Sequence, residues 1–453
     1  MCGARDFRNL REGPGRGRVS LDFEFPELHL GSRGLAVTAM AVLVRQQRIG
    51  FMLYDAIVVG ARCAGSPTAM LLSRKGYRVL LVERASFPSD VVSTLIIKYP
   101  GVQLLKQWGL LGAVMATNCP PVRQWLDHKG DFLLSAPLPA VDHVVTVAPR
   151  RIVLDRILAA AAVQSGADLL ENCVVEEILS RDGRVTGIRG RTRGGGSVTA
   201  HGRIVIGADG KHSLLARTVK PETYHCHPVR ACYYYAFWSG IPDMGLVSYW
   251  RNQHFVLAIP TNDRLTCLVI ARPAAEFDSV RKNVEAAYWR CLEISPLLHE
   301  YARQGRREGR FIGTVDLPNV YRKPFGPGWA LAGDAGHHED PLMGHGIMNA
   351  FHDAALLAEA IDAGFSGRMD LDVSLADYEI QRNQWSLPAY RRNVAAALLE
   401  GWDSEQELRL RSALRDNPHE AGRYFGVRVY AVPFEQFFSA ENIARIAGNG
   451  LTF

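Results

Sequence analysis

The most constraining feature of this chain is a Gly-bounded turn, Gly60-Ala-Arg-Cys-Ala-Gly65, set between a buried-strand pattern and a helix pattern. The run 53–59 (LYDAIVV) ends in apolar residues, a helical pattern covers 66–75, and a second apolar run follows at 79–82. Together they predict a β-α-β unit of about 30 residues. Small residues at such a turn let a phosphate approach the N–H groups of the helix N-terminus. We therefore expect a parallel sheet that binds a nucleotide.

The turn departs from the usual G-x-G-x-x-G pattern, because Arg62 occupies the second Gly position. Its side chain must point away from a bound phosphate or wrap over it. Glu83 lies 23 residues after Gly60, at the end of the second strand, where a carboxylate accepts hydrogen bonds from ribose hydroxyls. Taken alone, these residues also fit a tight strand-to-helix turn followed by an exposed Glu.

Later segments predict a second sheet and a helical end to the chain. Aromatic and β-branched runs dominate 231–272 and are separated by Asn, Asp, Pro and Gly, a spacing typical of an antiparallel sheet with little helix. An apolar run at 329–332 enters another Gly-rich turn, and a helix pattern follows at 347–363. Beyond Leu371 the pattern is mainly helical and ends in an aromatic tail that we expect to pack on the body.

Two further segments place an Asp after an apolar strand and among small residues: IVIGADGKHSLLAR at 204–217 and WALAGDAGHHEDPLMGHGIMNAFHDAALL at 329–357. With the Gly60 turn and the connecting segment around Arg151, the chain resembles the FAD-dependent monooxygenases of the para-hydroxybenzoate hydroxylase type. That branch also contains geranylgeranyl reductases and flavin-dependent halogenases. The resemblance implies an α/β fold: a Rossmann-like FAD-binding domain with an inserted antiparallel β-sheet substrate domain and a helical C-terminal region.

We expect three structured parts after an N-terminal extension. The FAD-binding domain is discontinuous and covers 51–150, 200–220 and 320–370. The substrate-domain sheet covers 225–315 and the helical region 371–453. Residues 1–50 hold eight Arg against five acidic residues, and we interpret them as poorly ordered.

Charge, hydropathy and cysteine usage exclude other classes of protein. The net charge of +6 is too diffuse to follow a nucleic-acid backbone, so we expect no nucleic-acid partner. The apolar stretch 35–44 is far shorter than the ~20 residues of a spanning helix, so we expect no membrane span. Eight Cys without a C-x-x-C pair indicate a reducing, cytoplasmic compartment.

The resemblance implies that non-covalent FAD is held by residues of all three blocks and the connecting segment, namely Gly60, Gly65, Glu83, Arg84, Arg151, Asp209, Asp334, Pro341, Gly344 and Gly346. It places Glu83 at the adenosine ribose, Asp209 near the flavin and Asp334 at the ribityl and ribose side. The loop 341–346 approaches the isoalloxazine. Met348 stands where many members have Asn.

The aromatic strands supply the substrate-pocket candidates Tyr233, Tyr235, Phe237, Trp250 and Phe255. Aromatic residues also fill the core of any sheet, and because side chains alternate along a strand, only one in two faces a pocket.

The loop of the third block contains one catalytic candidate. His345, between two Gly expected to face the flavin, is suited to hydrogen-bond a substrate or intermediate, although a role in bracing the loop fits as well. We do not expect the adjacent run 337–340 (HHED) to bind a metal, because consecutive loop residues do not converge on one ion.

The resemblance implies a monooxygenase that inserts one oxygen atom from O2 into an organic substrate, aromatic, polyketide or terpenoid, through a flavin C4a-hydroperoxide. NADPH or NADH, or a partner flavin reductase, supplies the electrons. A double-bond reductase or dehydrogenase, a halogenase and a non-catalytic flavin-binding protein are the alternatives. Halogenases carry W-x-W-x-I-P and prenyl reductases Y-x-W-x-F-P-K, whereas this chain has Phe255-Val-Leu-Ala-Ile259-Pro260. The oligomeric state stays open.

Overall fold

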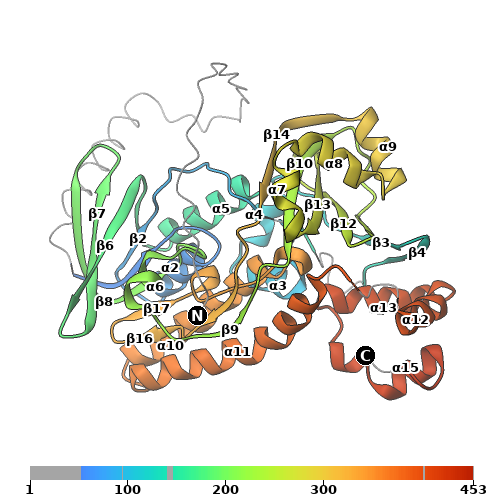
Figure 1. Cartoon of the computed structure of the whole chain (residues 1–453). Helices are drawn as coiled ribbons and strands as arrows, with labels where there is room; N and C mark the ends of the chain where they lie inside the picture. The colour runs from blue at the N-terminus through green and yellow to red at the C-terminus, as the bar shows by residue number, and fades with distance from the viewer. Residues whose placement is uncertain (1–52, 94, 140–145, 401–403, 452–453) are drawn as a thin grey trace. The chain divides into compact units, whose positions relative to one another are not determined.

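A computed structural model describes residues 53–93, 95–139, 146–400 and 404–451 (Figure 1). The extension expected at 1–50 lies outside them. The described part contains an eight-stranded sheet, a seven-stranded sheet, a three-stranded sheet and a series of helices. The mixed α/β class and the helical C-terminal region are as the sequence predicted.

The first sheet confirms the predicted β-α-β unit, formed by β1 (Leu53–Val59), α2 (Gly65–Arg74) and β2 (Val79–Val82). Strand β1 pairs in parallel with β2 and with β8. Strands β17 and β5 extend the parallel sheet on either side. The other strands of this sheet are β5 (Asp168–Leu170), β6 (Cys173–Arg181), β7 (Arg184–Thr192), β8 (Ser197–Gly207), β16 (Phe325–Gly326) and β17 (Trp329–Leu331).

This sheet is covered on both faces, which explains why its strands are apolar almost throughout. One face packs against α2, α5 (Arg151–Gln164) and α10 (Gly346–Phe365), and the cluster between them includes Ala56, Val58 and Phe351. The hairpin β6–β7 and α6 (Leu214–Val219) contribute to the cluster on the other face, with Ile57 and Val205.

The second sheet has the order β14-β10-β13-β12-β11-β3-β4. Its strands are β3 (Gln124–Lys129), β4 (Phe132–Pro137), β10 (Ala231–Ser239), β11 (Leu246–Arg251), β12 (His254–Pro260), β13 (Thr266–Pro273) and β14 (Arg306–Thr314). Strands β10 to β13 are antiparallel as predicted, but β3 pairs with β11 in parallel. The sequence analysis assigns the residues of β3 and β4 to the FAD-binding domain, and in the structure these two strands extend the second sheet.

Helices α8 (Val284–Leu292) and α9 (Pro296–Gln304) cover one face of the second sheet (Figure 1). The remaining elements before the C-terminal region are α3 (Tyr99–Gln107), α4 (Leu111–Met115), β9 (Thr223–His227), α7 (Phe277–Val280), β15 (Asn319–Arg322) and β18 (His337–His338). Strands β18, β15 and β9 form the third sheet.

The C-terminal helices are α11 (Leu371–Ala396), α12 (Glu405–Arg415), α13 (Pro418–Arg428), α14 (Phe434–Phe437) and α15 (Ala440–Ala447). The aromatic tail packs on the second sheet as expected, because Phe425 and Phe437 are fully buried in a cluster with its strands. A buried ion pair adds to this contact: Arg411 Nη1 lies 2.7 Å from Asp127 Oδ2 on β3, and both side chains are fully buried.

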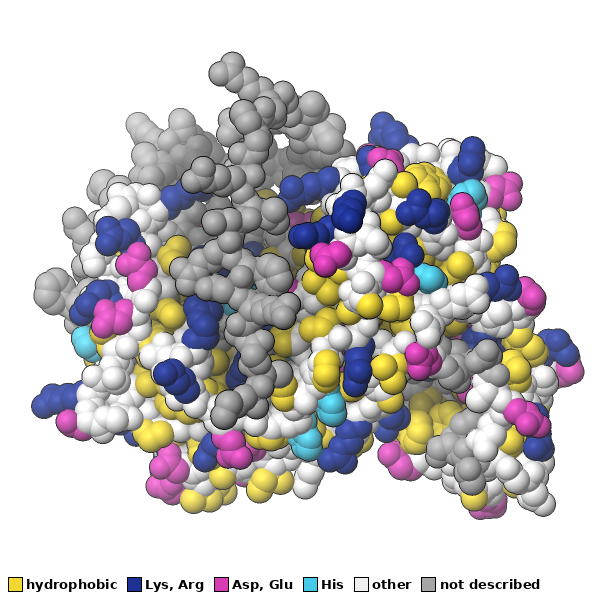
Figure 2. Space-filling view, viewed as in Figure 1, with side chains coloured by type: hydrophobic (Ala, Val, Ile, Leu, Met, Phe, Trp, Pro, Cys, Tyr) yellow, Lys and Arg dark blue, Asp and Glu magenta, His cyan; other side chains and the backbone are white. Residues whose placement is uncertain are grey.

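Positive and negative side chains are interspersed on the face of the molecule that Figure 2 shows. Pairs such as Arg189 and Glu177, 2.6 Å apart on neighbouring strands, illustrate the pattern. None of the helices in the described ranges has a stretch long and apolar enough to span a lipid bilayer.

Candidate nucleotide and substrate site

The three Gly- and Asp-containing blocks emerge at one edge of the first sheet. Val59 at the end of β1 pairs with Val82 of β2 and with Gly207 of β8, and Gly207 pairs with Leu331 of β17. Because these strands are parallel, the turns that follow them lie side by side at their carboxyl ends, where open α/β sheets bind ligands.

The turns after these strands approach each other too closely for side chains. A Cβ on Gly60, whose φ is +99°, would lie 2.4 Å from the Ala208 carbonyl oxygen, and one on Gly65 would lie 1.7 Å from the Gly60 carbonyl oxygen. A Cβ on Gly333 would lie 2.9 Å from Ala64 Cβ. The first turn therefore contacts both of the others, and only glycine fits at these positions.

The acidic side chains of the three blocks differ in what they contact. Glu83 is buried and accepts hydrogen bonds from the N–H groups of Ala61, at 2.9 Å, and Ala85, at 3.1 Å. Asp209 accepts from the Leu214 N–H at 2.8 Å through Oδ2, whereas its buried Oδ1 has no partner among the described residues. Burial raises the pKa of Asp209.

Asp334 lies on the short helix η3 (Gly333–Ala335) and is exposed. Its carboxylate accepts no hydrogen bond from the described residues, so it is available to a ligand. Arg84 directly follows Glu83 and is also exposed.

A buried carboxylate explains how Arg62 is accommodated in the first turn. Arg62 Nη1 donates to Asp155 Oδ2 at 2.7 Å, and its Nη2 donates to Ser89 Oγ at 2.8 Å. Arg151, at the start of α5, holds the same Asp155 through two hydrogen bonds of 3.0 Å. Arg62 Nη2 also lies 4.0 Å from Glu83 Oε1, so two guanidinium groups and two carboxylates balance beside the N-terminus of α2, which no side chain caps.

The loop of the third block leads into α10. This loop contains the short helix η4 (Pro341–Met343). Asp340 caps η4 by accepting a hydrogen bond from the Leu342 N–H at 3.0 Å. Gly344 is buried, whereas Gly346, the first residue of α10, is exposed, and no side chain caps this helix.

Met348, in the first turn of α10, is fully buried, so the Asn of other members is replaced here by a core residue. The neighbouring Asn349 instead directs its amide to Glu339 at 3.0 Å.

The structure places all five aromatic pocket candidates on the same face of the second sheet. Four of them belong to one buried apolar cluster, and Phe237 packs against it; the four are Tyr233, Tyr235, Trp250 and Phe255. The same cluster includes Leu342 of the third-block loop and Leu95 and Ile96, which precede α3. Residues of α12 and α13 pack into it as well. The aromatic face therefore meets the third-block loop.

A buried hydrogen bond joins these two parts directly. The Tyr233 hydroxyl donates to Asp340 Oδ1, and Asp340 Oδ2, also buried, has no partner among the described residues. Burial raises the pKa of Asp340 to about 7, although the Tyr233 hydroxyl and the Leu342 N–H act in the opposite direction.

His345 is held by a partner on each ring nitrogen. Its Nδ1 lies 3.3 Å from Glu339 Oε1 and its Nε2 lies 3.2 Å from the Tyr430 hydroxyl. A carboxylate only accepts hydrogen bonds, so we assign the proton to Nδ1, and Nε2 then accepts from Tyr430. Burial and the neighbouring Lys98 lower the pKa of His345, whereas Glu339 acts in the opposite direction.

Sequence reasoning did not find Lys98 and Tyr430. A lone Lys that ends an apolar run at 95–97 was the available signal for the first. Tyr430, in a left-handed backbone conformation with φ +64°, had none.

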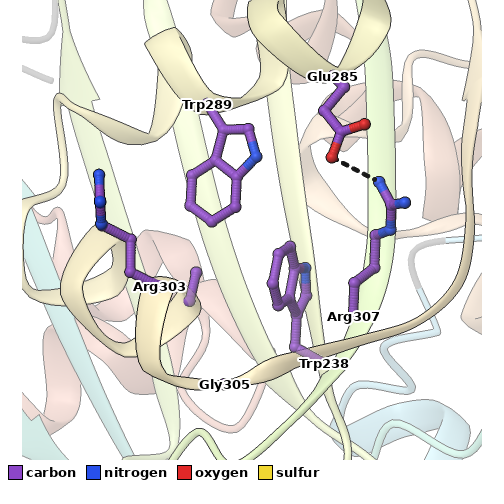
Figure 3. A pocket seen from close by; sticks show the side chains of 7 residues that line it. Trp238, Glu285, Trp289, Arg303, Gly305 and Arg307 are labelled. Atoms are coloured by element: carbon purple, nitrogen blue, oxygen red, sulfur yellow. Dashed lines mark hydrogen bonds and ion pairs between the residues drawn. The ribbon is translucent and has the colours of Figure 1, made fainter.

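A surface pocket lies on the opposite face of the second sheet and is separate from these residues (Figure 3). It lies between Trp238 of β10 and Trp289 of α8. Glu285 and Arg307 form an ion pair with an N–O distance of 3.3 Å along one side of the pocket. Trp238 belongs to the cluster under α8 and α9. This pocket therefore does not border the aromatic face or the third-block loop.

The residues at the sheet edge fit a dinucleotide cofactor. The glycine contacts bring bare backbone to the edge, two helix N-termini there lack side-chain caps, and a buried Asp209 oxygen lacks a partner. Backbone N–H groups suit phosphates, and carboxylates suit ribose and ribityl hydroxyls.

Comparison with known proteins agrees with this geometry. The family model for the FAD binding domain matches residues 53–392. The chain is 27% identical over 340 residues to a tryptophan 2-halogenase of Chondromyces crocatus, covering 71% of this chain and 64% of that protein. It is 26% identical over 379 residues to a digeranylgeranylglycerophospholipid reductase of Methanocella arvoryzae, covering 78% and 92%.

Among solved structures, the myxobacterial chondrochloren halogenase CndH superposes with a TM-score of 0.71 at 23% identity, covering 84% of this chain and 90% of that one. At this identity the likeness shows the fold alone.

Proposed function

Because the chain belongs to the FAD binding domain family, in the branch of the para-hydroxybenzoate hydroxylase type that also contains geranylgeranyl reductases and flavin-dependent halogenases, we propose that it is an FAD-dependent monooxygenase. It inserts one oxygen atom from O2 into an aromatic, polyketide or terpenoid substrate. One observation supports this proposal most directly: the aromatic face of the second sheet meets the loop 341–346 in one apolar cluster.

The residues of the sheet edge would hold the cofactor. The N-terminus of α2, with Gly60 and Gly65, binds the pyrophosphate, because the uncapped backbone N–H groups and the helix dipole favour an anion there. Glu83 binds hydroxyl groups of the adenosine ribose, and Asp334 binds hydroxyl groups on the ribityl side of FAD. When bound, FAD supplies the redox chemistry, with electrons from NADPH, NADH or a flavin reductase.

The chain's own residues exclude water and fix the geometry around the substrate. The aromatic face is buried and apolar, and residues of the C-terminal helices pack against it. The Tyr233 to Asp340 hydrogen bond keeps the sheet and the loop in register. The first turn of α10 presents backbone N–H groups to negative charge that develops at the loop.

A double-bond reductase is the second candidate, because the similarity to the Methanocella arvoryzae reductase covers 78% of this chain. Against it, Thr261 stands where the prenyl reductase pattern has Lys. Against halogenation, Phe255 and Leu257 stand where the halogenase pattern has Trp.

Mass spectrometry of the product separates these reactions. The FAD-loaded protein is incubated with candidate aromatic, polyketide or terpenoid substrates and with NADPH or NADH. The incubation is done with and without a flavin reductase, under 18O2 and with chloride present. A product with one 18O atom supports the monooxygenase. Gain of two hydrogens without 18O assigns the reductase, and gain of chlorine assigns the halogenase.

A further inference from the structure

A buried lysine lies beside the third-block loop without a carboxylate partner in contact. Lys98 is 4% exposed, and its Nζ lies 5.1 Å from the ring centroid of Tyr430. No hydrogen bond reaches this amine from the described residues. Buried lysines are rare and are ordinarily paired with an acid, so an unpaired one indicates a use for the amine.

The position of Lys98 connects it to both halves of the candidate site. Lys98 is the N-cap residue of α3. The first turn of α3 packs on α10, because a Cβ on Gly101 of α3 would lie 3.5 Å from the Cα of Met348 in α10. The residues just before it, Leu95 and Ile96, belong to the cluster of the aromatic face.

The ring under the Lys98 amine is fixed by a hydrogen-bonded chain. Tyr430 donates to His345 at 3.2 Å, and His345 donates to Glu339 at 3.3 Å. The other Glu339 oxygen accepts from Asn393 Nδ2 of α11 at 2.7 Å. With the Asn349 amide at 3.0 Å, Glu339 is held by three donors, and the Tyr430 hydroxyl is positioned through His345.

Burial favours the neutral form of the amine and has the largest effect. Among the charges around it, Glu339 from the loop attracts the ammonium most, whereas Arg428 from α13 and the exposed Arg392 from α11 repel it. His345 and Tyr430 are further titratable groups of this cluster, and burial lowers the pKa of the first and raises the pKa of the second. The result is a pKa for Lys98 of about 7, which lets the amine take up and release a proton at neutral pH.

We propose that Lys98 is the acid–base residue of the site and that it deprotonates an acidic hydroxyl of the substrate, a phenol or an enol. The nitrogen lone pair binds the proton, the O–H bond breaks, and its electron pair stays on the substrate oxygen. The ammonium later returns the proton to water. This inference rests on the proposed function, because oxygen insertion requires an electron-rich carbon and a phenolate or enolate provides one.

Titration of the amine tests the first half of the proposal. In protein labelled with 13C-lysine, NMR follows the Cε shift of each lysine against pH, and the Lys98 signal is the one lost in Lys98→Met or, as a second variant, Lys98→Arg. We expect its midpoint near 7. A midpoint at the ordinary lysine value of about 10.4 overturns the proposal. Lys323→Met is the matched control, because this exposed amine also lies 5.1 Å from an aromatic ring, that of Phe325.

Binding of 4-nitrophenol tests the second half, because its phenolate absorbs visible light. At one pH unit below the probe's own pKa, roughly one-tenth of the free probe is phenolate, so the protein is kept in excess of the probe. Wild type and Lys323→Met should raise the phenolate band several-fold above that of the free probe, and Lys98→Met should leave it at the free-probe level. A wild-type band no higher than that of the free probe, or an equal band with Lys98→Met, overturns the proposed role. FAD occupancy is measured on the same samples: loss of FAD binding by wild type refutes the proposed function, whereas FAD binding without the band refutes only the role of Lys98.

Discussion

Replacing Gly65 by Ala should destroy the nucleotide site while adding a single methyl group. The new Cβ would lie 1.7 Å from the Gly60 carbonyl oxygen, whereas an ordinary contact begins at 3.4 Å. The start of α2 and the turn before it must therefore separate by about 1.7 Å. Both sides of this contact are backbone, so no side chain can rotate to relieve it. Because this separation moves backbone N–H groups away from the pyrophosphate, and a hydrogen bond to a charged group contributes roughly 1.5–3 kcal/mol, we expect FAD affinity to fall at least about tenfold.

Flavin fluorescence measures this affinity during titration of apoprotein with FAD, and circular dichroism on heating measures stability. Gly112→Ala is the control for the same chemical change, because a Cβ on this helical glycine meets nothing within 4 Å. It should stabilise the protein by roughly 0.5–1 kcal/mol and leave FAD affinity unchanged. Wild-type affinity in Gly65→Ala would show that the turn does not bind the cofactor.

Three further predictions concern single side chains. Lys98→Met should remove a rise of the unfolding free energy with pH. Between pH 7 and 10.5 the unfolded chain binds one proton more than the folded chain at this lysine. The unfolding free energy of wild type therefore rises by ~1.4 kcal/mol per pH unit, roughly 5 kcal/mol in all. Urea unfolding of both proteins across this window checks it, and parallel pH curves would refute it. Asp334→Ala should weaken FAD binding more than tenfold, since a charged hydrogen bond contributes roughly 1.5–3 kcal/mol. The control Asp182→Ala, at an exposed carboxylate, should leave FAD binding unchanged. Equal FAD titration curves for the two variants would contradict this prediction. Arg411→Met should lower the unfolding free energy in urea by roughly 1.5–3 kcal/mol, because it removes a charged hydrogen bond from the buried Asp127, which keeps Arg428 at 3.2 Å. No measurable loss would be inconsistent with that pair.

Local patterns in the sequence were sufficient to predict the core of the nucleotide-binding fold. Strand β1 and helix α2 begin within one residue of the predicted positions, because an apolar run, a Gly-bounded turn and a helical repeat follow one another there. The convergence of the three blocks could be predicted from their order, because parallel strands present their carboxyl ends at one edge.

Features that depend on distant contacts could not be predicted in this way. Alternation along β10 left two faces for its aromatic residues, and only packing against Leu342 and the C-terminal helices distinguishes them. The pairing of β3 with β11 joins segments far apart in the chain and leaves no local pattern. Lys98 depends on Tyr430 in the same way, because burial by the C-terminal region gives this lysine its properties.

Titration of the apoprotein with FAD tests the central claim most directly, because that claim is that the three blocks form one binding site. We predict saturable binding of one FAD per chain, with weaker binding when either Asp209 or Asp334 is replaced by Ala, since these residues come from different blocks at the same sheet edge. Failure of the wild-type chain to bind FAD, or binding that neither substitution affects, would contradict it.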